Sequence, residues 1–317
     1  GASQLLCLNI NRGKLMSLFR SLVRRYKEKY DLVGILFIGP PIIYLFLIII
    51  YPLITIFPVS FQEYVPSSQS FVFVGLKQFQ LLFADKLFWL SIKTTFAFAG
   101  FTVILHLLLA WALALLLNAR WWPSWKVRNL FRAVLLFPWL FSPAACALLW
   151  GILYHPRGFL SYFSQQFLHT RIGFLSDPKV AFWSVLLVNG WNWYPFYMIL
   201  LLGGLQSIDR SLYESSEIDG ANRFQSFFHI TLTLMTPLMM MIVIIDFIGT
   251  FIVFDLVWIM TKGGPLRATY LISFFLYEKG FTTYKLGYAS AVSVFMALFL
   301  SAFVAVYLIL YLRRSKA

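Results

Sequence analysis

The chain has 317 residues, of which 60% are hydrophobic, 19% aromatic and only 12% charged. This composition excludes an ordinary soluble protein, whose charged fraction is about 25%, and indicates an integral membrane protein. The net charge of +14 does not favour nucleic-acid binding, because the basic residues cluster beside apolar segments, where the positive-inside rule accounts for them. Two cysteines, Cys7 in a polar tail and Cys146 in an apolar segment, predict no disulfide framework.

The apolar segments predict an all-α membrane protein with six transmembrane helices. Basic tails over residues 1–31 and 313–317 flank a six-helix domain over residues 32–312. The first apolar run is too long for the apolar part of a signal peptide, so we expect it to remain as a span. The predicted spans cover residues 32–57, 91–117, 133–154, 180–202, 236–260 and 286–312.

The distribution of basic residues predicts the orientation. Six spans place both termini on one side of the membrane. If that side is the cytoplasm, it carries 16 Lys and Arg residues against 10 outside, as the positive-inside rule favours. The outer segments, 62–90 and the loops up to Lys179 and Lys285, contain nine basic and four acidic residues, and Lys93 at the start of the second span is the tenth basic residue counted outside.

A polar loop over residues 207–233 joins the fourth and fifth spans. Its four carboxylates (Asp209, Glu214, Glu217 and Asp219) are too costly to place in hydrocarbon. Ser211 and Glu214 have the spacing of a capping box, which predicts a short helix from Leu212. Gly220 is suited to end that helix, and a second short helix is predicted from Arg223 towards His229. We expect this helix–turn–helix to lie flat on the cytoplasmic membrane surface and to contact a soluble partner.

The loop resembles the EAA loop of binding-protein-dependent ABC importer permeases. The matching positions are Glu214-Ser-Ser216, Asp219-Gly-Ala221 and Ile230-Thr-Leu-Thr233. Serines replace both alanines of the family pattern, and Thr233 replaces its proline. Motifs along most of the chain after residue 70 also resemble the carbohydrate-uptake branch, which includes the maltose permeases. They are Phe73-Val-Gly-Leu76, Leu115-Leu-Leu-Asn118, Phe131–Trp139, Val188-Asn-Gly-Trp191, Leu202–Ile208, Gly263-Gly-Pro265 and Leu286–Ser290.

The resemblance implies a type I importer permease of the bacterial cytoplasmic (inner) membrane, with a cytoplasmic coupling helix. Its implied partners are a second, homologous permease, two ABC ATPase subunits and a solute-binding protein. The sequence contains no Gly-x-x-x-x-Gly-Lys-Ser/Thr motif, so we expect ATP and Mg²⁺ on the ATPase subunits and no cofactor in this chain. The residues implied to contact the ATPase are Tyr213, Glu214, Ser215, Ser216, Asp219, Gly220, Ala221 and Arg223.

A sugar path needs groups that bond hydroxyls and flat rings that pack against sugars, within apolar walls. In the fourth span, resemblance to the maltose permease implies a lining role for Asn189, Asn192, Trp193 and Phe196. In the fifth span, Asp246, Gly249, Thr250 and Val253 share one helix face, and the lining positions of the family fall on it. The alternatives are an interfacial aromatic belt with asparagines bonded to a neighbouring helix, and an Asp246 paired with a basic residue of the partner permease.

The sequence therefore predicts a transport subunit without catalytic or metal-binding residues of its own. The four histidines lack metal-ligand spacing, and His106 is expected to pack within its span. An ion-coupled carrier, with Asp246 carrying the proton, remains an alternative. An intramembrane enzyme using Asp246 and Asp255 is disfavoured, because nine helical residues separate the two carboxylates by about 13.5 Å. A neutral and an anionic sugar both remain open as cargo.

Overall fold

The computed structural model describes residues 34, 36–65, 67–119 and 121–315, with side chains up to residue 309. The predicted basic tail over residues 1–31 lies outside the described residues. The chain divides into two compact units, which meet at Val59 and Ser60. The described part of the first unit is the helix Leu36–Val59, long and apolar enough to cross a membrane, as predicted. This helix contains a π-helical turn, η1 (Phe46–Ile50), followed by α2 (Tyr51–Val59).

The second unit opens with a small β-hairpin that the sequence did not predict. Strand β1 (Gln62–Val65) pairs with β2 (Ser70–Phe73) in antiparallel register, with Gln62 opposite Phe73. Helix α3 (Lys77–Ala84) follows, and the Asp85 side chain then accepts a hydrogen bond from Leu87 N–H and caps the next helix.

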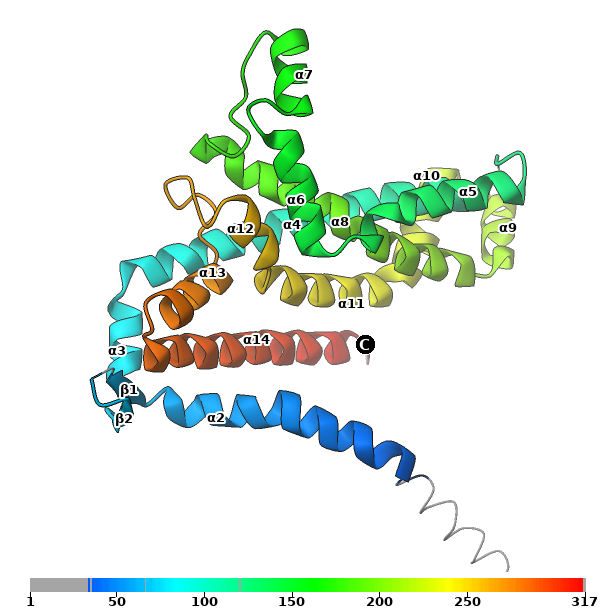
Figure 1. Cartoon of the computed structure of the whole chain (residues 1–317). Helices are drawn as coiled ribbons and strands as arrows, with labels where there is room; N and C mark the ends of the chain where they lie inside the picture. Colours follow the sequence, from blue (N-terminus) through cyan, green and yellow to red (C-terminus); the bar gives the residue numbers. More distant parts are fainter. Residues whose placement is uncertain (1–33, 35, 66, 120, 316–317) are drawn as a thin grey trace, which may run out of the picture. The chain divides into compact units, whose positions relative to one another are not determined.

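Long helices make up most of the second unit (Figure 1). They are α4 (Lys86–Asn118), α8 (Pro178–Ser207), α11 (Leu232–Phe251), which continues after a break into α12 (Asp255–Met260), and α14 (Leu286–Ser315). Among the described residues of both units, five helices are long and apolar enough to cross a membrane, and the number is six when a bent pair of helices is counted as one span. The predicted number of six spans therefore agrees with the structure.

The third span, predicted over residues 133–154, is not one helix. It consists of α5 (Trp125–Leu136), the 3₁₀ turn η2 (Phe137–Leu140) and α6 (Pro143–Tyr154), with a bend of 94° at the break. Pro138 and Pro143 lack the N–H groups that would continue a helix, and Ser142 caps α6 instead. The predicted outer loop beyond it contains another helix, α7 (Phe159–Leu168).

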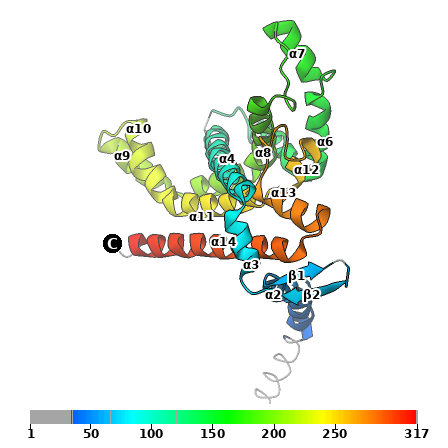
Figure 2. The ribbon, with the colours of Figure 1, turned by 90° about the vertical axis from the view of Figure 1, so that its left-hand side faces the viewer.

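The packing of α4 against α8 forms the centre of this unit, and α11 lies beside both (Figure 2). The helices approach closely because small residues occupy the contact. Ala110 and Ala114 of α4 are fully buried, and a Cβ atom on Gly190 of α8 would lie only 2.4 Å from the Leu105 side chain. This close packing brings polar residues of three helices together.

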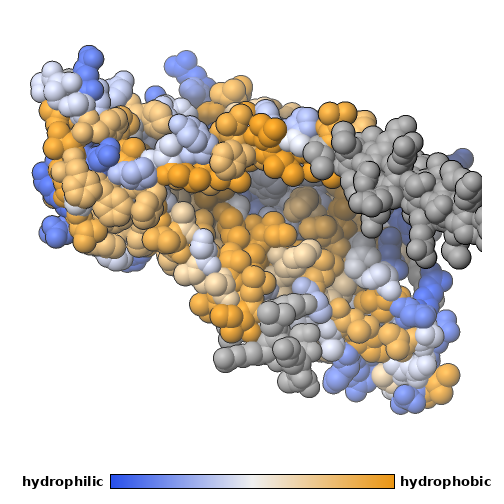
Figure 3. Space-filling model, turned by 90° about the horizontal axis from the view of Figure 1, so that it is seen from below, coloured by the Kyte–Doolittle hydropathy of each residue, from blue (hydrophilic) through white to orange (hydrophobic). Residues whose placement is uncertain are grey.

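The remaining elements lie at the two ends of these helices. Helices α9 (Arg210–Ile218) and α10 (Arg223–Ser226) and the π-helical turn η3 (Phe227–Thr231) connect α8 to α11. At the other end of α11, the chain continues through α12, α13 (Ile272–Tyr277) and η4 (Glu278–Thr282). Apolar side chains cover much of the face drawn in Figure 3, with hydrophilic ones gathered towards its ends, as suits contact with lipid.

Candidate functional site

A cavity of about 380 Å³ lies between α4, α8 and α11, and we name it the α4–α8–α11 cavity. Its walls include seven of the eight residues that the sequence assigned to a substrate path: Asn189, Trp193, Phe196, Asp246, Gly249, Thr250 and Val253. His106 from α4 and Tyr197 from α8 also line it. Contact between these residues and a transported molecule stays a prediction, but the structure places them in one cavity.

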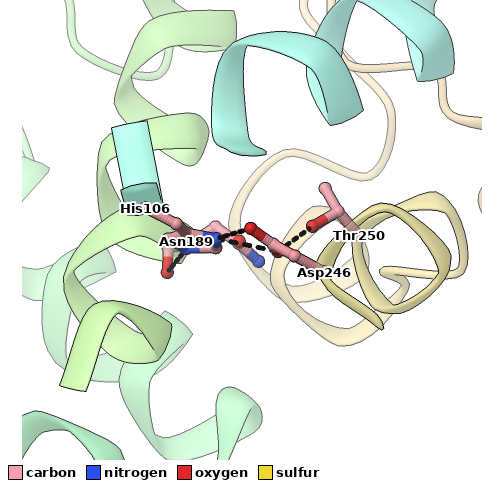
Figure 4. A network of polar contacts seen from close by, with 4 residues as sticks. All are labelled: His106, Asn189, Asp246 and Thr250. Atoms are coloured by element: carbon pink, nitrogen blue, oxygen red, sulfur yellow. Dashed lines mark hydrogen bonds and ion pairs between the residues drawn. The ribbon is translucent and has the colours of Figure 1, made fainter. Parts of the chain in front are cut away.

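A buried polar network forms one wall of the cavity (Figure 4). The Nδ1 atom of His106 lies 2.9 and 3.0 Å from the two carboxylate oxygens of Asp246, and each residue is only 1% exposed. The Thr250 hydroxyl donates to the same carboxylate over 3.1 Å. Asp246 is therefore paired within its own chain, and a basic residue of another subunit is not needed to compensate it.

Two asparagines on α8, three residues apart, have different surroundings. Both amide atoms of the Asn189 side chain are buried and have no hydrogen-bond partner, and this residue lines the cavity. The Asn192 amide instead donates to the carbonyls of Pro138 and Phe141 at 2.9 and 3.2 Å. Asn192 is absent from the cavity wall, so the sequence-based grouping of these two residues does not match their positions.

Asn192 stabilises the break in the third span. The bend between α5 and α6 leaves backbone carbonyls without helical partners, and such groups need donors inside a membrane. Asn192 donates to the Phe141 carbonyl and also to the Pro138 carbonyl, which in addition accepts from the Phe141 N–H. The Tyr194 hydroxyl donates to the Leu135 carbonyl over 3.0 Å. The alternative that an asparagine bonds a neighbouring helical segment therefore holds for Asn192.

Aromatic rings form a second wall of the cavity. Phe196 contacts the rings of Trp193 and Tyr197 edge-on, with centroid distances of 6.5 and 5.2 Å. The ring of Trp139, from η2, lies 5.6 Å from that of Phe196. The cavity thus combines flat apolar surfaces with a few convergent polar groups, a combination typical of small-molecule sites.

The second candidate site is the segment 210–226, which we name the α9–α10 turn. The prediction that Ser211 caps its first helix is wrong: Asp209 is the N-cap and accepts from the Ser211 N–H over 3.0 Å. Aspartate two residues earlier competes successfully because it forms the stronger, charged cap. The first helix accordingly begins at Arg210 rather than Leu212.

The sharp turn and the second helix agree with the prediction. Gly220 has a left-handed backbone with φ of +81°, and the N–H groups of Gly220 and Ala221 donate back to the carbonyls of Glu217 and Ser216. The Asn222 side chain then caps α10 in a reciprocal capping box with Gln225. Local sequence signals therefore determine the shape of this segment.

Side-chain hydrogen bonds join the two halves of the turn. The hydroxyl groups of Ser216 and Ser226 are 3.0 Å apart, and those of Tyr213 and Thr231 are 2.8 Å apart. The first pair links α9 to α10, and the second links α9 to η3, directly before α11. The serine that replaces an alanine of the family pattern at position 216 thus has a structural role.

The outward side of the turn combines charged and apolar groups. Glu214, Ser215, Asp219, Gly220 and Arg223 are exposed, and Ala221 is half-buried. Two apolar side chains that the sequence analysis did not single out, Ile218 and Phe224, are 86% and 72% exposed. Ile218 could have been recognised in the sequence, because it has no large apolar neighbour at helical spacing, whereas Phe224 has Phe228 four residues later, with ring centroids 4.7 Å apart.

A groove of about 960 Å³ opens beside the turn. Its walls come from the C-terminal end of α4, the start of α5, the end of α8 and the turn itself, including Tyr213, Glu214 and Arg223.

Backbone and hydroxyl hydrogen bonds from Ser211 lower the pKa of Asp209 at the entry to the turn. Its carboxylate therefore stays ionised at neutral pH and keeps α9 capped. Among the described residues, no group of three His, Cys, Asp or Glu side chains could hold a metal ion.

Several membrane-spanning helices around a partly polar cavity, with a surface turn joining two of the cavity helices, define a multi-pass membrane transport protein. The sequence comparison makes this class specific. The family model for the binding-protein-dependent transport system inner membrane component matches residues 106–316. The chain belongs to this family of ABC transporter permeases.

Named relatives and solved structures agree with this assignment. The trehalose/maltose transport system permease protein of Thermococcus litoralis is 32% identical over 292 residues, which cover 91% of this chain and 96% of that one. The sulfoquinovosyl glycerol transport system permease protein of Agrobacterium fabrum is 31% identical, with 87% and 89% covered. A bacterial ABC transporter involved in alginate import has a chain of the same fold, with a TM-score of 0.79, 24% identity and coverage of 92% and 99%.

Proposed function

We propose that this chain is the translocating subunit of an ATP-driven importer for a sugar or oligosaccharide, which a solute-binding protein delivers. Two named relatives carry sugars or a sugar derivative. The cavity offers what such a cargo needs, since aromatic rings pack against the faces of sugar rings and buried amides bond their hydroxyls.

One observation carries the mechanism: both helices that supply most of the cavity wall connect directly to the α9–α10 turn. Phe196 lies about 17 Å along α8 from its end at Ser207, and Asp246 lies about 21 Å along α11 from its start. The hydroxyl pairs described above tie α9 to α10 and η3. A displacement of the turn therefore moves both walls of the cavity, which is what alternating access requires.

The turn is the proposed docking element for an ABC ATPase subunit. It presents carboxylates, an arginine and the apolar side chains of Ile218 and Phe224 on one exposed segment. Apolar anchors surrounded by charge suit a soluble partner surface. In the complete transporter, two ATPase subunits hold ATP and Mg²⁺, and this chain pairs with a second permease through its exposed apolar helix faces. The turn and the tails over residues 1–31 and 313–317 lie in the cytoplasm.

Alternating access in this scheme is a shift between two states of the whole assembly. ATP acts on this chain only through contacts that differ between the states. Closure of the ATPase pair moves the turn, and the cavity then opens towards a docked, loaded binding protein. The permease does no chemistry in this cycle, and hydrolysis belongs to the ATPase subunits.

Uptake by membrane vesicles that contain the complete transporter tests this function. The probes are radiolabelled trehalose, maltose, sulfoquinovosyl glycerol and an alginate oligosaccharide, each with the cognate binding protein, with or without ATP on the ATPase side. We expect uptake of at least one probe that needs ATP and persists when a protonophore collapses the proton gradient. Uptake that needs the gradient and not ATP would instead identify an ion-coupled carrier.

A further inference from the structure

His106 is the one residue of α4 that joins the polar wall of the α4–α8–α11 cavity. It lies in the middle of a 33-residue helix and is 1% exposed. Both of its ring nitrogens have partners on other helices: Nδ1 faces the Asp246 carboxylate on α11, and Nε2 lies 3.2 Å from the Asn189 carbonyl oxygen on α8. One imidazole thus links three helices (Figure 4).

Opposite an ionised Asp246, both partners of this ring are hydrogen-bond acceptors. A neutral imidazole carries one N–H and one lone pair, so one nitrogen would direct its lone pair at an oxygen lone pair. Only the doubly protonated ring donates in both directions. The positive charge is then compensated at contact distance by the Asp246 carboxylate, as buried charges require.

The side chain of Asn189, in contrast to that of His106, has no hydrogen-bond partner. The backbone carbonyl of Asn189 accepts from His106, whereas both polar atoms of the side chain are buried without a partner. An unpartnered buried amide is costly unless a ligand or water supplies the missing bonds. This amide lies in the wall of the cavity, and a sugar hydroxyl can both donate to its oxygen and accept from its nitrogen.

We propose that His106 is a positioning residue of the sugar path: as an imidazolium it holds and neutralises the Asp246 carboxylate, and it leaves the Asn189 amide as the group that bonds cargo hydroxyls. The proposal rests on the proposed function. The other titratable groups around the pair are Tyr197 on α8, whose ring centroid lies 5.1 Å from that of His106, and Asp255 at the start of α12, which lines the same cavity. The Tyr197 hydroxyl also bonds the Asp246 carboxylate but carries no positive charge, and Asp255 is a second carboxylate, so neither neutralises Asp246.

Infrared spectroscopy of the purified, complete transporter tests the protonation directly. The difference spectrum between wild type and Asp246→Asn should contain carboxylate bands and no stretch of a protonated carboxylic acid. In His106→Gln, the amide can still bond Asp246 but cannot compensate its charge, so the buried carboxyl should take up a proton and show the acid stretch. An acid stretch in the wild type would overturn the proposal.

Transport by variants tests the role of the pair. We expect His106→Gln and Asp246→Asn each to lower ATP-driven uptake about tenfold or more, because each removes one member of the pair and forces the other to change its protonation at a cost in free energy. The double variant, which is neutral throughout, should recover to within about threefold of wild type, since coupled residues are not additive. If the fold-decrease in uptake for the double variant equals the product of the two single fold-decreases, an ion pair between the residues is contradicted.

Asn189→Ala separates cargo contact from structure. We expect it to lower uptake of the transported probe while the ATPase activity stimulated by the binding protein persists and the thermal unfolding temperature does not fall. Unchanged uptake would remove Asn189 from the sugar path and leave the proposed function intact. If no probe gives ATP-driven uptake with the wild-type transporter, the proposed function itself fails, and the infrared result alone still decides the charge of His106.

Discussion

The α9–α10 turn and the α4–α8–α11 cavity are built in opposite ways. The turn is a continuous segment whose caps, glycine and hydroxyl pairs all lie within about twenty residues of one another, and its outward face is exposed. The cavity joins residues of α4, α8 and α11, among them the bonded pair His106 and Asp246, which are 140 positions apart, and these polar groups are buried. The turn has the properties of a rigid segment that a partner can displace, and the cavity has those of a ligand-binding site.

This difference explains how substitutions should act. A change in the turn should alter coupling to a partner while the fold of the spans survives. A change in the cavity should act through buried polar groups. When one member of a pair is removed, the other loses its hydrogen bond or its counter-charge. Paired variants separate these two kinds of effect.

The largest effect is expected at Gly220. Its φ of +81° is strained for any residue with a side chain, and Gly220→Val adds a β-branched group on the exposed face of the turn. We expect ATP-driven uptake to fall by about tenfold or more through the loss of about 1–2 kcal/mol of local backbone stability and of docking. The control is Gly203→Ala in α8, where an added Cβ meets no atom within 4 Å. Equal uptake by both variants would contradict the role of the turn.

The next comparison uses the two asparagines of α8. Asn192→Ala leaves the Phe141 carbonyl without its side-chain donor and the Pro138 carbonyl with the Phe141 N–H alone, in the break of the third span, so we expect a loss of about 1–3 kcal/mol in unfolding free energy. Asn189→Ala removes an amide that has no partner and should not destabilise the protein. Thermal unfolding of the detergent-solubilised transporter measures both. A larger loss for Asn189→Ala than for Asn192→Ala would reverse the assignment of the two residues.

These two asparagines also indicate where sequence reasoning reached its limit. The pattern on α8 identifies a polar, aromatic segment, but it cannot distinguish the residue that faces the cavity from the one that faces the break, because the break itself depends on how α5 and α6 bend. His106 is a similar case: alone in an apolar helix it suggests only packing, and its partners on α8 and α11 become visible only in three dimensions. The turn was predicted in more detail because caps and glycine act locally.

A smaller effect is expected for the hydroxyl links within the turn. Tyr213→Phe removes the bond between α9 and η3, and Ser216→Ala removes the bond between α9 and α10. Each should cost about 0.5–1.5 kcal/mol and should raise amide hydrogen exchange in residues 210–231. Ser215→Ala, an exposed serine on the same helix, is the control. Exchange that rises equally in all three variants would mean that the hydroxyl links do not hold the turn together.

The smallest effect is expected in α9 when the pH is lowered. The hydrogen bonds from Ser211 lower the pKa of Asp209, so its stabilisation of α9 is fully present above the ordinary aspartate pKa and is lost as the pH falls through the lowered value. Hydrogen exchange in α9 should therefore increase at acidic pH in the wild type. Asp209→Asn keeps a cap without the titrating group and should show no such increase. A pH dependence that persists in Asp209→Asn would assign it to another group.

The most direct measurement of the central claim follows the accessibility of the cavity while the turn is held or altered. Gly249 lines the cavity and has room for a Cβ atom, so Gly249→Cys can be placed there in a background that carries Cys7→Ser and Cys146→Ala. In the complete transporter, ATP and loaded binding protein should change the rate at which a membrane-impermeant maleimide labels this cysteine, and Gly220→Val should abolish that change. A labelling rate that responds to ATP equally with and without Gly220→Val would contradict the coupling of turn and cavity.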